Sequence, residues 1–240
     1  MGTSKDRDGG SGGDWSPYKR AASDYAKGVS RRGGDPVKVE RVLGRHVAVL
    51  GGVGGAASSA AAGRQGLASL AGLLTGIAVE GLGPALQNAG LGSLVGQNRF
   101  DALDQLVTAI SGDGSDLESQ AARDALCDVF DELFDDDATT WTDLEATTLD
   151  ESAVVELLEM FLAHYIHNRL PVLPERLARL LDHNAVTAAE NQLIDTIRGY
   201  VYLHMPADPL TFDWSGADGA AFADQAIRTI YTALEGLVEE

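Results

Sequence analysis

Apolar residues recur every three or four positions along most of this chain, the spacing of one face of an α-helix. The clearest stretches lie beyond residue 97, at residues 100–110, 122–133, 150–169, 174–182, 185–203 and 217–238. Residues 150–169 are apolar on almost every side, so we expect them to form the central buried helix. Ser115 and Glu118 have the spacing of a capping box and predict the start of the helix that contains residues 122–133. The pattern predicts a mainly α fold.

The first part of the chain is richer in glycine, with 22 of the 28 glycines before residue 97. Asp35 and Pro36 predict the start of a helix that extends to Leu50. Residues 56–80 predict Ala/Gly-rich helices, whose small side chains allow close contact between helices. We therefore expect three parts: a leader over residues 1–34, a Gly/Ala-rich helical region over 35–96 and a helical bundle over 97–240.

The leader itself has two sections. Residues 1–14 place glycines among charged residues and offer no apolar surface, so we expect a disordered, Gly-rich N-terminal segment. Residues 15–30 then predict a short basic amphipathic helix, because Trp15, Tyr18, Ala22, Tyr25 and Val29 recur at helical spacing among Lys and Arg. Two roles stay open for its aromatic face, which either docks on the chain's own acidic body or is held by a partner protein.

The charge of the chain changes sharply after the leader. Residues 1–47 carry ten Lys+Arg against six Asp+Glu, whereas residues 48–240 carry eight against thirty. An acidic body repels phosphate backbones, and the basic residues of the leader are interleaved with acids, so direct nucleic-acid binding is disfavoured. The acidity favours solubility or a basic protein partner.

The cellular compartment follows from two further observations. Cys127 is the single cysteine and lies in an apolar helical pattern, which excludes an intramolecular disulfide and predicts a buried structural thiol. No apolar stretch follows the early charges as a secretory signal would require, and the most lipid-like run, residues 67–79, is too short to span a bilayer. We expect a cytoplasmic protein, with membrane association unlikely.

One motif imitates a dinucleotide-binding site. Gly52-x-Gly54-x-x-Ala57 follows the apolar run 46–50, and Glu80 ends a second such run. A dinucleotide fold would place these glycines beneath a pyrophosphate and the acid on a ribose hydroxyl. That fold needs more strands than this largely helical pattern offers, so a dinucleotide-binding enzyme is only an alternative.

No residue cluster has the spacing of a catalytic or metal site. His164 and His167 lie one helical turn apart, with Glu159 upstream, but no second cluster completes a zinc site. The acidic segment after Asp113 lacks the glycine and glutamate that a calcium loop requires. We expect no catalytic residue, no metal, no cofactor and no enzymatic activity.

Several short sequences resemble the QatB family of the bacterial QatABCD anti-phage system. They are Met1-Gly2-Thr3-Ser4, the leader with Trp15 and Lys19-Arg20, the run His46-Val-Ala-Val-Leu-Gly-Gly, and Asp208-Pro-Leu-x-x-Asp213-Trp214. The resemblance implies a defence protein encoded with an ATPase (QatA), a QueC-like enzyme (QatC) and a TatD-like nuclease (QatD). It further implies that QatC joins a 7-deazaguanine to an amino-terminal glycine of its partner.

Carried to this sequence, the resemblance makes Gly2 the modification acceptor and Thr3 and Ser4 its recognition residues. We expect a non-enzymatic component of an anti-phage complex, in which Trp15, Tyr18 and Tyr25 bind a partner. QatC is the expected partner, with QatA and QatD as further candidates. A membrane-acting defence effector that uses the Gly/Ala-rich residues 50–96 is an alternative of a different class.

Overall fold

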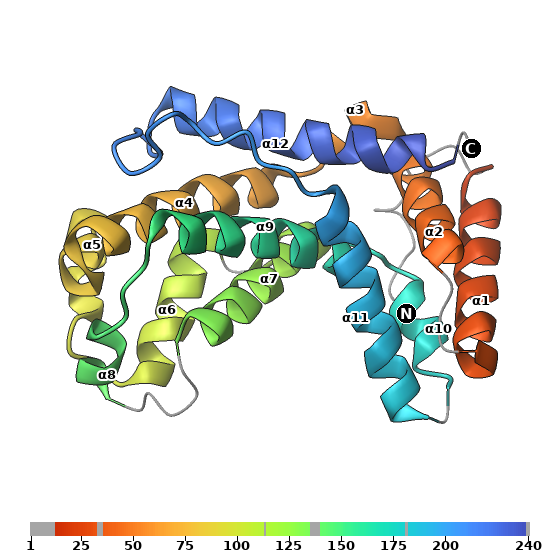
Figure 1. Cartoon of the computed structure of the whole chain (residues 1–240), viewed down its shortest axis with the longest axis horizontal. Coiled ribbons are helices and arrows are strands. Elements are labelled where there is room, and N and C mark those ends of the chain that lie inside the picture. Colours follow the sequence, from red (N-terminus) through yellow and green to blue (C-terminus); the bar gives the residue numbers. More distant parts are fainter. Residues whose placement is uncertain (1–12, 33–35, 113, 135–139, 181, 239–240) are drawn as a thin grey trace. The chain divides into compact units, whose positions relative to one another are not determined.

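The computed structural model describes residues 13–32, 36–112, 114–134, 140–180 and 182–238, and within these ranges no strand occurs. The helices are α1 (Trp15–Arg32), α2 (Pro36–Val49), α3 (Gly52–Ser58), α4 (Ala61–Glu80), α5 (Leu82–Asn88), η2 (Gly92–Leu94, a 3-10 helix), α6 (Arg99–Ser111), α7 (Leu117–Leu133), α8 (Trp141–Glu145), α9 (Glu151–Asn168), α10 (Leu173–Leu177), α11 (His183–Tyr200) and α12 (Ala217–Gly236) (Figure 1). The predicted mainly α fold is confirmed.

The chain divides into two compact units that are not continuous in sequence. Unit 1 contains residues 1–60, 169–202 and 227–240, and unit 2 contains residues 61–168 and 203–226. This differs from the expected boundary near residue 97, which falls inside unit 2. The difference arises because the chain returns twice to unit 1, and helical periodicity carries no information about such long-range contacts.

Unit 1 is built around the leader helix. Helix α1 packs on α2, α10 and α11, and α2 also contacts α3 and α11. Gly44 of α2 permits a close approach to the end of α12 and the residues after it, because a Cβ at this position would lie 3.0 Å from the Leu234 carbonyl oxygen and 2.2 Å from Val238 Cγ2. The core of unit 1 is therefore formed by helices from three separate stretches of sequence.

Unit 2 has α9 at its centre, as the apolar pattern predicted, with α4 and α7 packed on it (Figure 1). Two glycines of α4 face aromatic rings of α9. A Cβ at Gly63 would lie 2.3 Å from Tyr165 Cζ, and one at Gly66 would lie 2.8 Å from Phe161 Cζ. The expected role of small residues in close helix packing is confirmed here.

The runs that imitate a dinucleotide fold are helical. Residues 46–49 belong to α2 and residues 76–80 to α4. At the junction of α2 and α3, Gly51 and the first residue of α3, Gly52, adopt φ values of 91° and 73°, which glycine tolerates in a tight turn. Because neither run is a strand, the dinucleotide-binding alternative is wrong.

Three local predictions also need correction. The N-cap of α7 is Asp116, one residue after the predicted Ser115, and its carboxylate accepts from the Glu118 and Ser119 amides. Cys127 is exposed, because the buried face of α7 passes through Leu126 and Val129. Phe100, expected on the buried stripe of α6, is 82% exposed.

No helix within the described ranges is both long and apolar enough to cross a membrane.

Candidate functional site

The sequence-predicted site residues fall into two groups. Gly2, Thr3 and Ser4 lie outside the described residues. Trp15, Tyr18 and Tyr25 lie on α1, where Trp15 is half-buried and both tyrosines are completely buried. The structure therefore separates one aromatic residue that a partner can reach from two that form part of the core.

Tyr25 fixes α1 to α11. Its hydroxyl donates to the Ala189 carbonyl at 2.9 Å and lies 3.1 Å from Gln192 Oε1. The Tyr18 ring lies 5.6 Å from the His46 ring on α2. Docking of the aromatic face on the chain itself is thus confirmed, and a partner could contact these tyrosines only if α1 left its place.

The outward side of α1 is polar and mostly basic. Lys19, Arg20 and Lys27 are exposed, with Asp24 between them. The Lys19 ammonium lies 5.5 Å from the centre of the Trp15 ring, which is a cation–π distance. Trp15 and the basic residues that follow it are the part of α1 available to another protein, and partner binding there stays a prediction.

His46 is an unusual member of the same core. Its side chain is only 2% exposed, and neither ring nitrogen has a hydrogen-bond partner among the described residues. Burial lowers the pKa of His46 to about 3, and the positive charge of Arg169 contributes to this lowering. The imidazole is therefore neutral at physiological pH, and it is enclosed too completely to take part in chemistry with a substrate.

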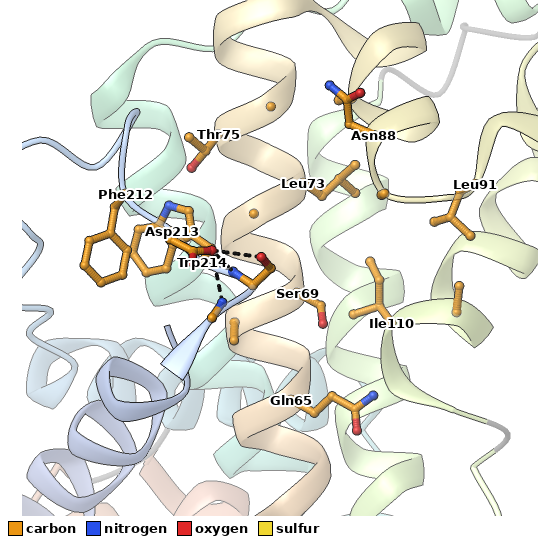
Figure 2. Close-up of a pocket in the computed structure, with 18 of the residues that line it drawn as sticks. Gln65, Ser69, Leu73, Thr75, Asn88, Leu91, Ile110, Phe212, Asp213 and Trp214 are labelled. Carbon is orange, nitrogen blue, oxygen red and sulfur yellow. Dashed lines mark hydrogen bonds between the residues drawn. The ribbon is translucent and has the colours of Figure 1, made fainter. Parts of the chain in front are cut away.

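The segment Asp208–Trp214, singled out in the sequence, forms a folded turn of unit 2 before α12 (Figure 2). Trp214 is 4% exposed, its indole N–H donates to the Pro209 carbonyl at 3.0 Å, and its ring makes edge contacts with Phe212 and Phe222. Asp213 Oδ1 accepts from the amides of Ser215 and Gly216 at 3.1 and 3.0 Å and so holds the entrance to α12. These contacts give the motif a structural basis.

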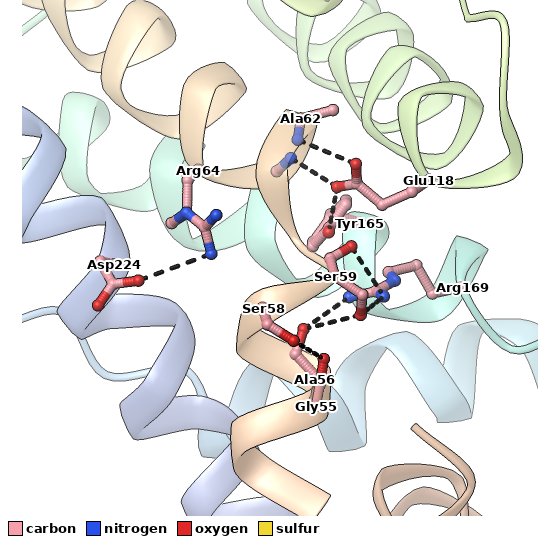
Figure 3. A network of polar contacts seen from close by, with 11 residues as sticks. Gly55, Ala56, Ser58, Ser59, Ala62, Arg64, Glu118, Tyr165, Arg169 and Asp224 are labelled. Carbon is pink, nitrogen blue, oxygen red and sulfur yellow. Dashed lines mark hydrogen bonds and ion pairs between the residues drawn. The ribbon is translucent and has the colours of Figure 1, made fainter. Parts of the chain in front are cut away.

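Figure 3 shows a polar cluster around Arg169 in unit 1. The guanidinium donates to the Tyr231 hydroxyl and to Ser59 Oγ, both at 2.7 Å, and lies within 3.5 Å of the Ala56 carbonyl. A cation at the last carbonyls of α3 complements the negative end of that helix. Arg169 therefore ties α3 to α12 and has a structural role.

Glu118 organises a second cluster, which lies in unit 2 (Figure 3). Its carboxylate accepts from the Ala62 and Gly63 amides, each at 2.9 Å, and from the Tyr165 hydroxyl at 2.6 Å. Two of the free N–H groups of the first turn of α4 are thereby satisfied by a residue of α7. The sequence assigned Glu118 to the cap of its own helix, and no local signal could identify this long-range role.

The remaining reactive residue types include a histidine paired with an aspartate and an exposed cysteine. His164 Nδ1 lies 2.6 Å from Asp128 Oδ2, so these two side chains form a polar pair. Although the Cys127 side chain is exposed, its thiol is partly shielded from water, which raises its pKa, and the negative charges of Asp124, Asp131 and Asp128 add to this rise. The thiol therefore stays protonated at neutral pH. Among the described residues, no group of three or more His, Cys, Asp or Glu could hold a metal ion.

Comparison with known families decides the identity of the chain. A family model described as "Qat anti-phage system associated protein QatB" matches residues 51–234. The chain belongs to the QatB family. The match covers α3 to α11 and nearly all of α12, including Asp208–Trp214, whereas α1 and α2 precede it. Membership implies a role in Qat anti-phage defence together with other components of that system.

No curated protein and no solved structure matches the chain.

Proposed function

We propose that this QatB-family protein is a non-enzymatic component of the defence complex, and that it presents Gly2 for conjugation to a 7-deazaguanine by QatC. The observation that carries the proposal is the combination of family membership with the sequence Met1-Gly2-Thr3-Ser4 ahead of a firmly docked α1. Thr3 and Ser4 are the proposed recognition residues. The activity belongs to the partner, and the complex acts in the cytoplasm.

The chemistry suits an α-amine. An α-amino group has an ordinary pKa of about 7.7–8.0, so an appreciable fraction is neutral and nucleophilic at physiological pH, unlike the lysine amine. In the proposed step, the amine of Gly2 attacks the acyl carbon of an adenylated 7-carboxy-deazaguanine. A carbon–nitrogen bond forms, the bond to AMP breaks with AMP leaving, and the amine loses one proton. Glycine offers the least hindered α-amine for this attack.

The anchoring of α1 supports the presentation of Gly2. Tyr18 and Tyr25 hold α1 in the core of unit 1, so Trp15 is a fixed attachment point. Trp15 lies thirteen residue-to-residue steps after Gly2, and a chain of that length can span at most about 45 Å. That reach is sufficient to enter a recessed active site while the folded body stays outside.

The exposed part of α1 supplies the proposed docking surface. Trp15 offers an aromatic anchor, and Lys19 and Arg20 offer positive charge, which in partner recognition mainly raises the association rate. We predict that Arg20→Glu lowers the modification rate by QatC about tenfold. Arg198→Glu makes the same charge change at an exposed position of α11 and leaves the rate within twofold. Equal effects of the two variants contradict docking through α1.

Co-expression with QatC followed by mass spectrometry of the N-terminal peptide tests the acceptor. Gly2→Ala keeps a small second residue, so the initiator methionine is still removed, but it adds a methyl group beside the amine. We expect this variant to lose at least nine-tenths of the modification, whereas Gly10→Ala in the same leader is modified normally. A conjugate on any internal residue rejects Gly2 as the acceptor. Full modification of Gly2→Ala contradicts the argument that the unhindered amine of glycine is required.

The observations give no support to the membrane-acting alternative. The Gly/Ala-rich α4 already buries Leu67, Leu70 and Leu74 in the core of unit 2. Insertion of this helix into a bilayer would require that core to open.

A further inference from the structure

The Asp208–Trp214 segment has a second structural role, which the proposed function does not use. It forms one wall of an open groove of about 920 Å³ within unit 2 (Figure 2). One face of α4 forms the floor, α5 and α6 form the opposite wall, and the first turns of α12 close one end. All residues that line the groove lie within the stretch matched by the QatB family.

The length of the groove favours a helical occupant. Its floor extends along α4 from Arg64 to Glu80. At a rise of about 1.5 Å per residue, these sixteen steps correspond to about 24 Å, or more than four turns. A small ligand would occupy only part of that length, whereas an amphipathic helix laid in a groove contacts it throughout.

The lining is apolar where such a helix would insert. Val79 on the floor is 62% exposed, and Phe212 and Leu91 are half-exposed on opposite sides. In Figure 2, Leu73 and Ile110 lie on the side away from Phe212 and Trp214, so apolar side chains stand on both sides of α4. Leu73, Ile110 and Trp214 are already buried. An occupant would therefore remove mainly the surface of Val79, Phe212 and Leu91 from water, which is the main source of favourable free energy in such contacts.

A buried polar group provides independent evidence that the groove receives another molecule. Thr75 lines the groove, is only 6% exposed, and its hydroxyl has no hydrogen-bond partner among the described residues. Figure 2 shows the hydroxyl on the side of α4 that faces Phe212 and Asp213. A buried hydroxyl without a partner is unfavourable, and a polar group of an occupant would satisfy it.

The charge of the groove defines the chemistry of the occupant. Four charged side chains line it, and three of them are acidic: Glu80, Asp213 and Asp224. The fourth, Arg64, pairs with Asp224 at 3.6 Å. The remaining negative charge favours a helix that carries Lys or Arg beside its apolar stripe.

We propose that this groove binds a basic amphipathic helix of a partner protein. The interaction is separate from the modification of Gly2, because every residue that forms it belongs to unit 2. It gives the QatB-family body a binding role besides that of the leader.

The test uses the full chain and a fluorescent Leu/Lys amphipathic peptide of about 18 residues, whose helix would be about 27 Å long. Binding is measured by anisotropy. Val79→Lys places a cation in the groove and is expected to weaken binding about tenfold. The matched control Leu117→Lys makes the same charge change at a residue of unit 2 that is 74% exposed and does not line the groove, and binding should stay within twofold.

Ser69→Trp, at an exposed position on the groove floor, provides a second variant that blocks the groove by size without changing charge. It should also weaken binding about tenfold. Four outcomes overturn the proposal: no binding of the Leu/Lys peptide, equal binding of a Leu/Glu peptide, equal weakening by Val79→Lys and Leu117→Lys, or binding unaffected by Ser69→Trp. The third would indicate only a general attraction between the basic peptide and the acidic chain.

Discussion

Replacement of His46 by leucine should make the stability of the protein less sensitive to acid. The imidazole is enclosed between α1 and α2, and its pKa is lowered to about 3 in the folded protein, compared with 6.5 for an ordinary histidine. Below pH 6.5 the unfolded chain therefore binds a proton at this position, whereas the folded chain does not. Protonation favours the unfolded state, so the stabilisation present above pH 6.5 is lost as the pH falls towards 3.

The size of the effect follows from the same two values. Each pH unit below 6.5 costs about 1.4 kcal/mol as long as the folded histidine stays neutral. Between pH 7.5 and pH 5.5 the free energy of unfolding should fall by about 1.4 kcal/mol because of His46 alone. His46→Leu removes this contribution, and it also removes two buried ring nitrogens without hydrogen-bond partners.

Urea denaturation followed by circular dichroism measures the effect at the two pH values. We expect the free energy of unfolding of His46→Leu, relative to the natural chain, to rise by about 1.4 kcal/mol from pH 7.5 to pH 5.5. His183→Leu is the control: it removes an exposed histidine, and so shows how much of the change in the free energy of unfolding comes from the loss of any one titratable side chain. If the difference in the free energy of unfolding between His46→Leu and the natural chain does not change with pH, the argument is refuted.

Two further predictions concern unit 2 and the close contacts of its glycines. Glu118→Ala should lower the free energy of unfolding by about 2–4 kcal/mol, because two amides of α4 and the Tyr165 hydroxyl lose an ionised acceptor. The control Glu132→Ala, at an exposed position of the same helix, should change the free energy of unfolding by less than about 0.5 kcal/mol. Equal effects in urea denaturation would show that the carboxylate of Glu118 contributes nothing specific. Gly63→Ala should lower the free energy of unfolding of the protein by about 1–3 kcal/mol, because its methyl group would overlap the Tyr165 ring. In Gly54→Ala, in α3, the added methyl group meets no atom within 4 Å, so this variant should raise the free energy of unfolding by about 0.5–1 kcal/mol. Thermal unfolding measures the stability of both variants. A Gly63→Ala protein as stable as the natural chain would contradict the packing argument.

Helices of three or more turns could be predicted from the sequence because each repeats its apolar pattern several times. The predicted start at Pro36 and the buried helix at 150–169 correspond closely to α2 and α9. Helices α5 and α8 were not predicted, since seven and five residues are too few to establish a period. The apolar pattern of the sequence was thus sufficient to predict the fold class, but it was insufficient to predict short connecting helices.

The candidate site was less predictable because its residues meet through long-range contacts. The pattern of α1 predicted a buried aromatic face, but it could not specify whether that face belonged to a partner or to α11. The Asp208–Trp214 motif could be recognised in the sequence, while its place beside α4 required the structure. The same holds for Glu118, whose amide partners lie more than fifty residues away.

The most direct test of the proposed function is the mass of the N-terminal peptide of this protein, purified from cells in which the complete Qat system protects against phage. We predict a peptide that begins at Gly2 and carries a 7-deazaguanine joined through an amide bond to the glycine nitrogen. A free, unmodified Gly2 amine in that defence-competent complex would contradict it.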